Sequence, residues 1–143
     1  MAAEDKKKLT TIEKVIFLKY VDFFEHATIE QLGRIAGLTE EVHFEPEEII
    51  FEEGGPGDSL YVLITGQAMY EKNGKVTSQI KEKEAFGTLG ALDFQPRFYT
   101  TKAIDHVHAI RLDAQDFHDL LSLDIEMVEA VFRGLCRRIR ENR

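Results

Sequence analysis

The sequence has little cysteine: Cys136 is the single thiol among 143 residues. One cysteine excludes an internal disulfide and any zinc or iron–sulfur site that needs several cysteine ligands. No segment approaches the roughly 20 apolar residues that a transmembrane helix needs, and no signal peptide is visible. These absences predict a cytoplasmic chain. Cys136 itself is expected to be a small packing residue in the last helix.

Positive charge is also scarce, because 18 lysines and arginines stand against 26 aspartates and glutamates, giving a net charge of −8. Such a chain repels a polyanion, so nucleic-acid binding by this chain alone is not expected. The C-terminal segment is the exception, with Arg133, Arg137, Arg138, Arg140 and Arg143. These cations either complement the dipole at the end of a helix or face an acidic partner or the rest of a longer chain.

The length indicates one domain, preceded by a polar tail over residues 1–10 that we expect to be flexible. Residues 11–40 are expected to form two short helices, because apolar residues recur there at helical spacing. Thr28 and Gln31 have the spacing of a capping box at the start of the second helix. Gly37 is expected to end that helix as a C′ glycine.

From residue 41 to residue 112 the apolar pattern changes to a period of two, which predicts β-strands. Pro56-Gly57 fits the central pair of a type II turn, and Asn73-Gly74 fits a type I′ hairpin turn. About six or seven short strands separated by glycine turns favour a mainly β fold with flanking helices. The expected architecture is an antiparallel jelly-roll β-barrel.

Residues 113–143 are expected to be helical again, with Asp113 as the cap of a short helix before a long one. Along the long helix an apolar stripe recurs at alternating steps of three and four residues. Its members are Ile125, Val128, Phe132, Leu135 and Ile139. The stripe either packs on the barrel or pairs with a second copy of itself, in a homodimer through the C-terminal helix.

Arg97 is the basic residue whose surroundings most need an explanation. It lies between Pro96 and Phe98, among aromatic and apolar neighbours of the segment 84–103. A guanidinium in such surroundings needs an anionic partner. Asp93 is one candidate in the chain, and a bound ligand is the other.

Two motifs resemble those of the cyclic nucleotide-binding domain family, which includes the catabolite activator protein and the regulatory subunits of kinases. "FEEGGPGDSLYVLITG", residues 51–66, is similar to the family's strand–turn–strand signature. "FGTLGALDFQPRFYTTKA", residues 86–103, aligns without gaps to its phosphate-binding cassette. The resemblance covers nearly the whole chain and implies an eight-stranded jelly roll with helices at both ends.

The resemblance also implies a ligand site for cAMP or cGMP in this cassette. A short helix, expected from Gly87 to Leu92, would present backbone N–H groups to the cyclic phosphate, and Arg97 would pair with its oxygens. The implied ligand-binding residues are Phe86, Gly87, Thr88, Leu89, Arg97 and Phe98. The alternative is that Arg97 pairs with Asp93 or a glutamate and that no ligand binds.

Three departures from the family pattern weaken this expectation. Thr88 stands where the family has a glutamate that binds the ribose 2′-hydroxyl, a loss that lowers affinity about tenfold to hundredfold. Phe98 and Tyr99 replace small residues and could fill the phosphate pocket or shift Arg97. Gly90 replaces an alanine and loosens the short helix. The site is therefore expected to bind a cyclic nucleotide weakly, to bind another small anion, or to bind nothing.

Three functions follow as alternatives. The first is a non-catalytic regulatory sensor without a cofactor, in which a small anion repositions the last helix and Phe132 covers the base. The second is a ligand-free module that dimerises through that helix. The third is a cupin-like metal enzyme, suggested by His106 and His108 on one face of a strand. We expect either a stand-alone domain or a fragment of a larger protein whose output lies elsewhere.

Overall fold

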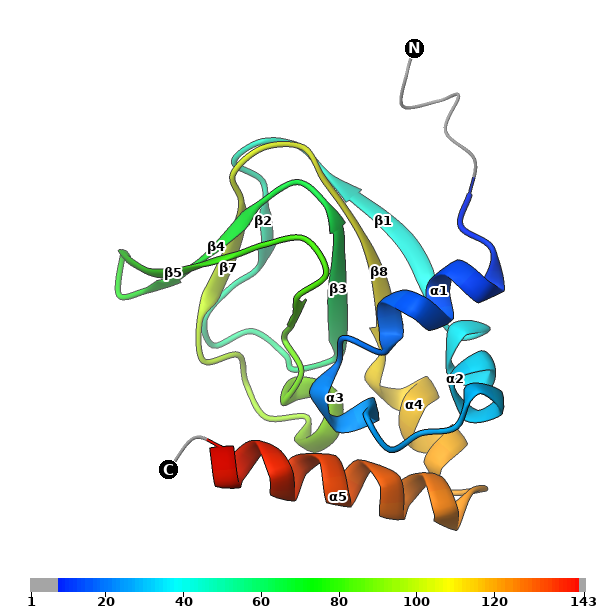
Figure 1. The fold of residues 1–143 in the computed structure, drawn as a ribbon. Coiled ribbons are helices and arrows are strands. Elements are labelled where there is room, and N and C mark those ends of the chain that lie inside the picture. Colours follow the sequence, from blue (N-terminus) through cyan, green and yellow to red (C-terminus); the bar gives the residue numbers. More distant parts are fainter. Residues whose placement is uncertain (1–7, 142–143) are drawn as a thin grey trace.

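The computed structural model describes residues 8–141 and shows a jelly roll of two four-stranded sheets with helices at both ends (Figure 1). The first sheet contains, in spatial order, β1 (Glu40–Phe44), β8 (Val107–Asp113), β3 (Ser59–Thr65) and β6 (Ala85–Phe86). The second contains β2 (Ile49–Phe51), β7 (Thr100–Ala103), β4 (Ala68–Lys72) and β5 (Lys75–Ile80). Every pairing between these strands is antiparallel, which confirms the predicted fold class.

Helices precede, interrupt and follow the strands. They are α1 (Thr11–Leu18), the short 3₁₀ helix η1 (Asp22–Phe24), α2 (Ile29–Ala36), α3 (Gly90–Asp93), α4 (Ala114–Leu121) and α5 (Ile125–Glu141). None of the helices within residues 8–141 combines the length and apolar character that crossing a bilayer requires.

The folded part of the chain begins earlier than expected. Thr10 caps α1 in a capping box with Glu13, and the Leu9 N–H donates to the Glu41 carboxylate at 2.8 Å. Residues 9 and 10 are thus held by the fold, whereas residues 1–7 of the expected flexible tail lie outside the described residues.

Local signals placed most helix starts correctly. Thr28 and Gln31 form the predicted capping box of α2, and the Asp113 side chain accepts the Asp116 N–H at the start of α4. The end of α2 differs from the expectation. Gly37 is its C-cap with a right-handed backbone (φ −65°), so it is not a left-handed C′ glycine.

The two predicted turns have different outcomes. Asn73 and Gly74 both have positive φ, 54° and 79°, as the type I′ hairpin between β4 and β5 requires. The predicted type II turn at Pro56-Gly57 is wrong. Such a turn needs a positive φ at Gly57, whereas the residue with a positive φ in this loop is Gly54 (83°). Gly57 is needed for a different reason: a Cβ there would collide with the carbonyl oxygen of Gln95.

Strand β3 is buried on both faces, which explains its unbroken apolar run. Leu60 and Val62 face a cluster under the helices, where Phe23, Phe24 and Phe117 pack ring against ring. Tyr61 and Leu63 face the second cluster, inside the barrel, which also holds Phe86 and Ile80. A strand shared by two cores cannot show polar alternation.

Helix α5 runs beneath the barrel and packs against η1 (Figure 1). It buries Met127, Ala130, Val131 and Gly134. The predicted stripe lies on another face: Ile125 and Phe132 are 72% and 69% exposed, and Leu135 alone among its five members packs against the core. The alternative in which the whole stripe packs on the barrel is therefore wrong.

Candidate functional site

A cavity of about 490 Å³ is lined by the cassette, by strands β2 and β4 and by helix α5. Five of the six implied ligand-binding residues line it: Gly87, Thr88, Leu89, Arg97 and Phe98. Phe86 does not. It is buried in the barrel core, where its ring stacks on Tyr61 with 5.0 Å between centroids.

The Arg97 guanidinium is buried and held by acceptors from the start of β3. Its Nη2 donates to the carbonyl oxygen of Ser59 at 2.8 Å and to the Ser59 hydroxyl at 3.1 Å. The same nitrogen lies 3.3 Å from the carboxylate of Asp58, and Nη1 donates to the Gly87 carbonyl at 3.1 Å. The anionic partner in the chain is thus Asp58, and the expected pairing with Asp93 or a glutamate is wrong.

Arg97 still has a free donor. Within residues 8–141 two buried side-chain polar atoms lack a hydrogen-bond partner, Arg97 Nε and Thr101 Oγ1. Burial lowers the pKa of Arg97, although the nearby Tyr61 and Asp58 act in the opposite direction. The guanidinium also lies 4.1 Å from the centroid of the Phe51 ring. A buried cation with an unpaired N–H group is stabilised by an anion that can bind it.

Gly87 makes this placement of Arg97 possible. Its φ is +69°, in the left-handed region that favours glycine. A Cβ at this position would lie 2.8 Å from Arg97 Nη1 and 3.2 Å from the Phe51 ring. Gly87 is therefore fixed by its backbone conformation and by the close approach of Arg97.

The cassette helix is shorter than expected. α3 begins at Gly90 rather than near Gly87, and it ends after one turn at Asp93, where Phe94 adopts φ 57°. The Ala91 N–H, at the start of this helix, is not free for a ligand, because it donates to the Thr88 carbonyl oxygen at 3.2 Å. A single turn contributes little macrodipole, so the electrostatics of the site rest on arginine rather than on the helix.

Phe98 and Tyr99 do not fill the cavity. Both line it, but Phe98 is 64% exposed and packs edge-on against Tyr99. Lys72 Nζ lies 3.9 Å from the centroid of the Phe98 ring and holds it at the surface. The expectation that these aromatic rings occupy the phosphate pocket is wrong.

Three further residues of the cavity were not found from the sequence. Phe51 and Tyr70 come from β2 and β4, and Arg138 comes from α5. Burial raises the pKa of Tyr70 to about 12, so its hydroxyl is neutral at physiological pH. Phe132, which was expected to cover a bound base, is not among the lining residues.

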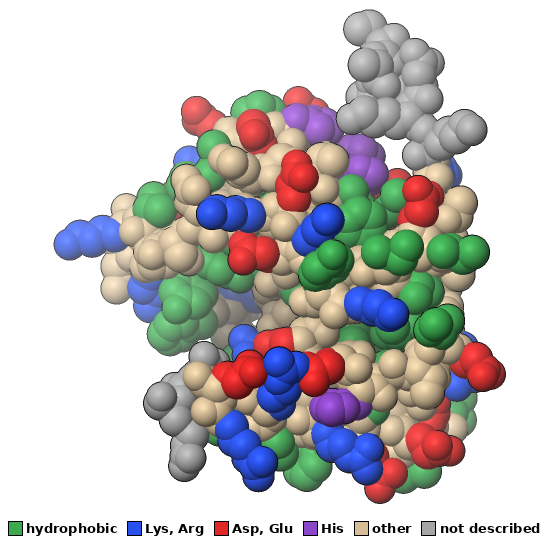
Figure 2. Space-filling model, in the orientation of Figure 1, with side chains coloured by type: hydrophobic (Ala, Val, Ile, Leu, Met, Phe, Trp, Pro, Cys, Tyr) green, Lys and Arg blue, Asp and Glu red, His purple; other side chains and the backbone are tan. Residues whose placement is uncertain are grey.

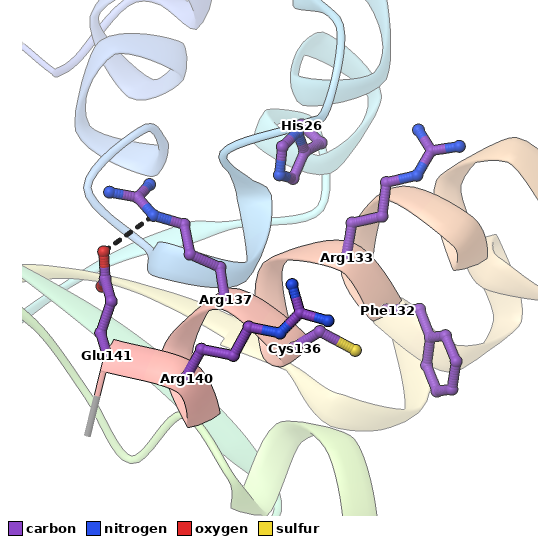
Figure 3. Close-up of a pocket in the computed structure, with 7 residues that line it drawn as sticks. All are labelled: His26, Phe132, Arg133, Cys136, Arg137, Arg140 and Glu141. Atoms are coloured by element: carbon purple, nitrogen blue, oxygen red, sulfur yellow. Dashed lines mark hydrogen bonds and ion pairs between the residues drawn. The ribbon is translucent and has the colours of Figure 1, made fainter. Parts of the chain in front are cut away.

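Phe132 instead lines a separate groove on the outer side of α5 (Figure 3). Arg133, Arg137 and Arg140 also line this groove, and Arg137 bonds Glu141 at 2.9 Å. Cys136 is exposed there, so the expectation that it is a packing residue is wrong. Arg143, the last cation of the predicted cluster, lies outside the described residues.

The histidines of the HxH motif belong to a cluster with His43 of β1, and histidine side chains gather at the upper end of the molecule in Figure 2. His108 lies on β8, whereas His106 precedes this strand, so the two are not on one strand as expected. His43 stacks on His108 with 4.4 Å between ring centroids and contacts His106 at 3.3 Å. His108 bonds Glu41 at 2.9 Å, and His106 lies 3.5 Å from Glu45. Among residues 8–141 no group of three His, Cys, Asp or Glu side chains is arranged to hold a metal ion.

Comparison with known proteins agrees with this geometry. The jelly roll, the cassette and the buried arginine beside the cavity are the features to compare with other proteins. Residues 41–124 match the family model of the Cyclic nucleotide-binding domain, and the chain belongs to this family.

Three relatives illustrate the match. The cAMP-dependent protein kinase regulatory subunit of Dictyostelium discoideum is 27% identical over 117 residues, covering 76% of this chain and 34% of that protein. The N-terminal domain of a transcriptional regulator from Streptomyces coelicolor superposes with a TM-score of 0.79 at 27% identity, covering 88% and 92% of the two chains. The chain spans about a third of the curated kinase subunit that it matches.

The third is a cAMP-bound mutant of the regulatory subunit of a cAMP-independent protein kinase A from Trypanosoma brucei. It superposes with a TM-score of 0.74 at 27% identity, covering 81% of this chain and 43% of that chain.

Proposed function

We propose that this chain is a non-catalytic sensor domain that binds a cyclic nucleotide or another small anion beside Arg97 and signals through α5. The observation that carries the proposal is the unpartnered Nε–H of Arg97, a buried cation that lines a cavity of about 490 Å³. This volume is within the range of roughly 300–1,000 Å³ that is usual for small-molecule sites. The names of the relatives, which include kinase regulatory subunits, support a regulatory role.

Signalling needs an element whose contacts depend on the ligand. Helix α5 meets this requirement, because its Arg138 donates to the hydroxyl of Thr88 at 3.2 Å. Thr88 lies in the cassette, so a ligand that contacts Thr88 or Arg138 changes how α5 is held. We assign no catalytic residue, metal ligand or resident cofactor to this domain.

Calorimetric titration with cAMP and with cGMP tests the proposal. We expect saturable binding by the parent chain and none by Arg97→Ala, because that change removes the buried cation of the cassette. Arg133→Ala, which removes a charge from the groove of Figure 3, is the matched control and should bind as the parent does. Absence of binding of both nucleotides at millimolar concentration would reject a sensor of cyclic nucleotides.

The exposed stripe of α5 favours a second candidate, a ligand-free module that forms a homodimer. Phe132 and Ile139 are 69% and 66% exposed on a helix that otherwise packs on η1. Under this candidate Phe132→Glu converts a dimer to a monomer without loss of stability, which sedimentation equilibrium measures. Ile12→Glu, at an exposed position of α1, is the control, and a parent chain that sediments as a monomer rejects this candidate.

A further inference from the structure

We propose that this cavity prefers a nucleotide with an open, doubly charged phosphate monoester over one with a cyclic phosphate. The inference rests on the proposed function, because the ligand lies in the same cavity. Its basis is a second guanidinium, Arg138, which lines the cavity together with Arg97.

The two arginines bond consecutive residues of the cassette. Arg97 Nη1 donates to the carbonyl of Gly87 at 3.1 Å, and Arg138 Nη1 donates to the hydroxyl of Thr88 at 3.2 Å. The two cations therefore approach the same short stretch of chain, Arg97 from the cassette and Arg138 from α5. An anion between them can accept from both forks.

The charged residues that line the cavity are two cations and one carboxylate, whereas the carboxylates that pair with the two cations lie outside the lining. Asp58 lies against Arg97, and Asp22 lies 3.3 Å from Arg138 Nε. Among the described lining residues Asp93 is the acidic one, and its carboxylate accepts the Gln95 N–H at 3.0 Å. Position 88 contributes a neutral hydroxyl, so two cations meet one carboxylate in the cavity wall.

The pair between Arg138 and Asp22 does not prevent this role. The Asp22 side chain is 48% exposed and that of Arg138 is 32% exposed, so solvent screens their attraction. A ligand phosphate can therefore take the place of Asp22 as the partner of Arg138.

The phosphate chemistry then separates two ligand classes. A cyclic phosphate is a diester with one negative charge, and its ring fixes two of its four oxygens. A monoester carries close to two charges at pH 7, because its second pKa is about 6, and it offers three free oxygens. The monoester therefore offers enough charge and free oxygens to pair with both Arg97 and Arg138.

The test compares four probes by calorimetry at one ionic strength: adenosine 5′-monophosphate, its phosphate methyl ester, cAMP and adenosine. The methyl ester is an open-chain monoanion, so it separates charge from ring opening. We expect adenosine 5′-monophosphate to bind about tenfold more tightly than the methyl ester or cAMP, and adenosine to bind most weakly.

Three variants identify the cause. Arg138→Gln should lower affinity for adenosine 5′-monophosphate about tenfold and leave the methyl ester within about threefold. Asp22→Asn breaks the same link between α5 and η1 but frees Arg138, so it should bind the monophosphate as tightly as the parent or more tightly. Arg140→Gln removes an equal charge from the groove in Figure 3 and should change nothing. Thermal unfolding of each variant confirms that it is folded.

The outcomes distinguish the two proposals. If cAMP binds as tightly as the monophosphate, or if Arg140→Gln acts like Arg138→Gln, then this inference is wrong and the sensor stands. If no probe binds and Arg97→Ala has no effect, then both proposals fail. If Asp22→Asn weakens binding as much as Arg138→Gln, Arg138 acts by anchoring α5 and the assignment of a second ligand cation is overturned.

Discussion

Gly90 and Arg97 are in direct steric contact: a Cβ on Gly90 would lie 2.8 Å from Arg97 Nη1. The same Cβ would lie 2.9 Å from the Cα of Gly57, which belongs to the backbone and cannot swing aside. The absence of a Cβ at Gly90 therefore affects more than the stability of α3. It lets the guanidinium sit deep enough to reach the carbonyl oxygen of Ser59.

Gly90→Ala should therefore displace Arg97 from Ser59 toward the cavity. We expect the free energy of unfolding to fall by about 1–3 kcal/mol, because the added methyl overpacks a close contact. Nucleotide affinity should rise, because fewer bonds to Ser59 compete with the ligand. Denaturant titration and calorimetry measure the two effects, and a fall in both would show that the arginine is disordered rather than redirected.

Thr88→Glu restores the charge that the family pattern has at this position. From the sequence alone this change is expected to tighten cyclic nucleotide binding. In the structure Arg138 bonds the Thr88 hydroxyl, so the new carboxylate pairs with Arg138 before it meets a ligand. We expect the single change to alter cAMP affinity less than about threefold, and Thr88→Glu with Arg138→Gln to tighten it about tenfold. Equal gains in both backgrounds, measured by calorimetry, would contradict this coupling.

Gly134 and Gly33 are a matched pair of helical glycines. A Cβ on Gly134 would lie 2.9 Å from the carbonyl carbon and oxygen of Phe23 in η1, whereas nothing lies within 4 Å of one on Gly33. Gly33→Ala should stabilise the fold by up to about 1 kcal/mol through helix propensity. Gly134→Ala should destabilise it by about 1–3 kcal/mol through overpacking. Urea denaturation measures both, and hydrogen exchange in α5 should rise only in the Gly134 variant.

Tyr70 predicts a loss of stability in alkaline solution. Burial raises its pKa to about 12, whereas the unfolded chain ionises near its ordinary value of 10.0. Deprotonation therefore favours the unfolded state, so the contribution of Tyr70 is complete below pH 10 and is lost as pH rises toward 12. The two-unit shift corresponds to roughly 2–3 kcal/mol.

Denaturant titrations at pH 9 and pH 11 on the parent and on Tyr70→Phe isolate this contribution from other alkaline titrations. Tyr20→Phe, at an exposed tyrosine, is the control and should keep the slope of the parent. A parent and a Tyr70→Phe variant with the same pH dependence would refute the assignment.

Much of the fold was predictable because its signals are local. The hairpin at Asn73-Gly74 and the caps at Thr28 and Asp113 depend on residues within three or four positions of one another. Strand β6 was missed, because two residues show no periodicity and their extended form comes from pairing with β3.

The face of α5 was mispredicted for a tertiary reason. A count of apolar residues selects Phe132 and Ile139, but the buried face is set by Gly134, which allows the helix to approach the backbone of Phe23. A glycine adds no hydrophobicity to a sequence pattern. Its role becomes visible only when its neighbour is known.

The site, like the fold, has a part that the sequence predicts and a part that it does not. Five lining residues of the cassette were found from a motif, because all five lie within one short segment of the sequence. Arg138 lies 50 residues from its partner Thr88, and Asp58 lies 39 residues from Arg97. Such contacts depend on how the sheets and α5 are packed, and no pattern within the cassette encodes them.

Ser59 and Gly87 receive most of the Arg97 donors from within the protein itself. The barrel consequently does not require a bound ligand in order to fold, and its fold does not depend on which ligand the cavity binds. Substitutions at the cavity rim can change which ligand binds, or abolish binding, without loss of the fold. A domain built in this way is free to diversify.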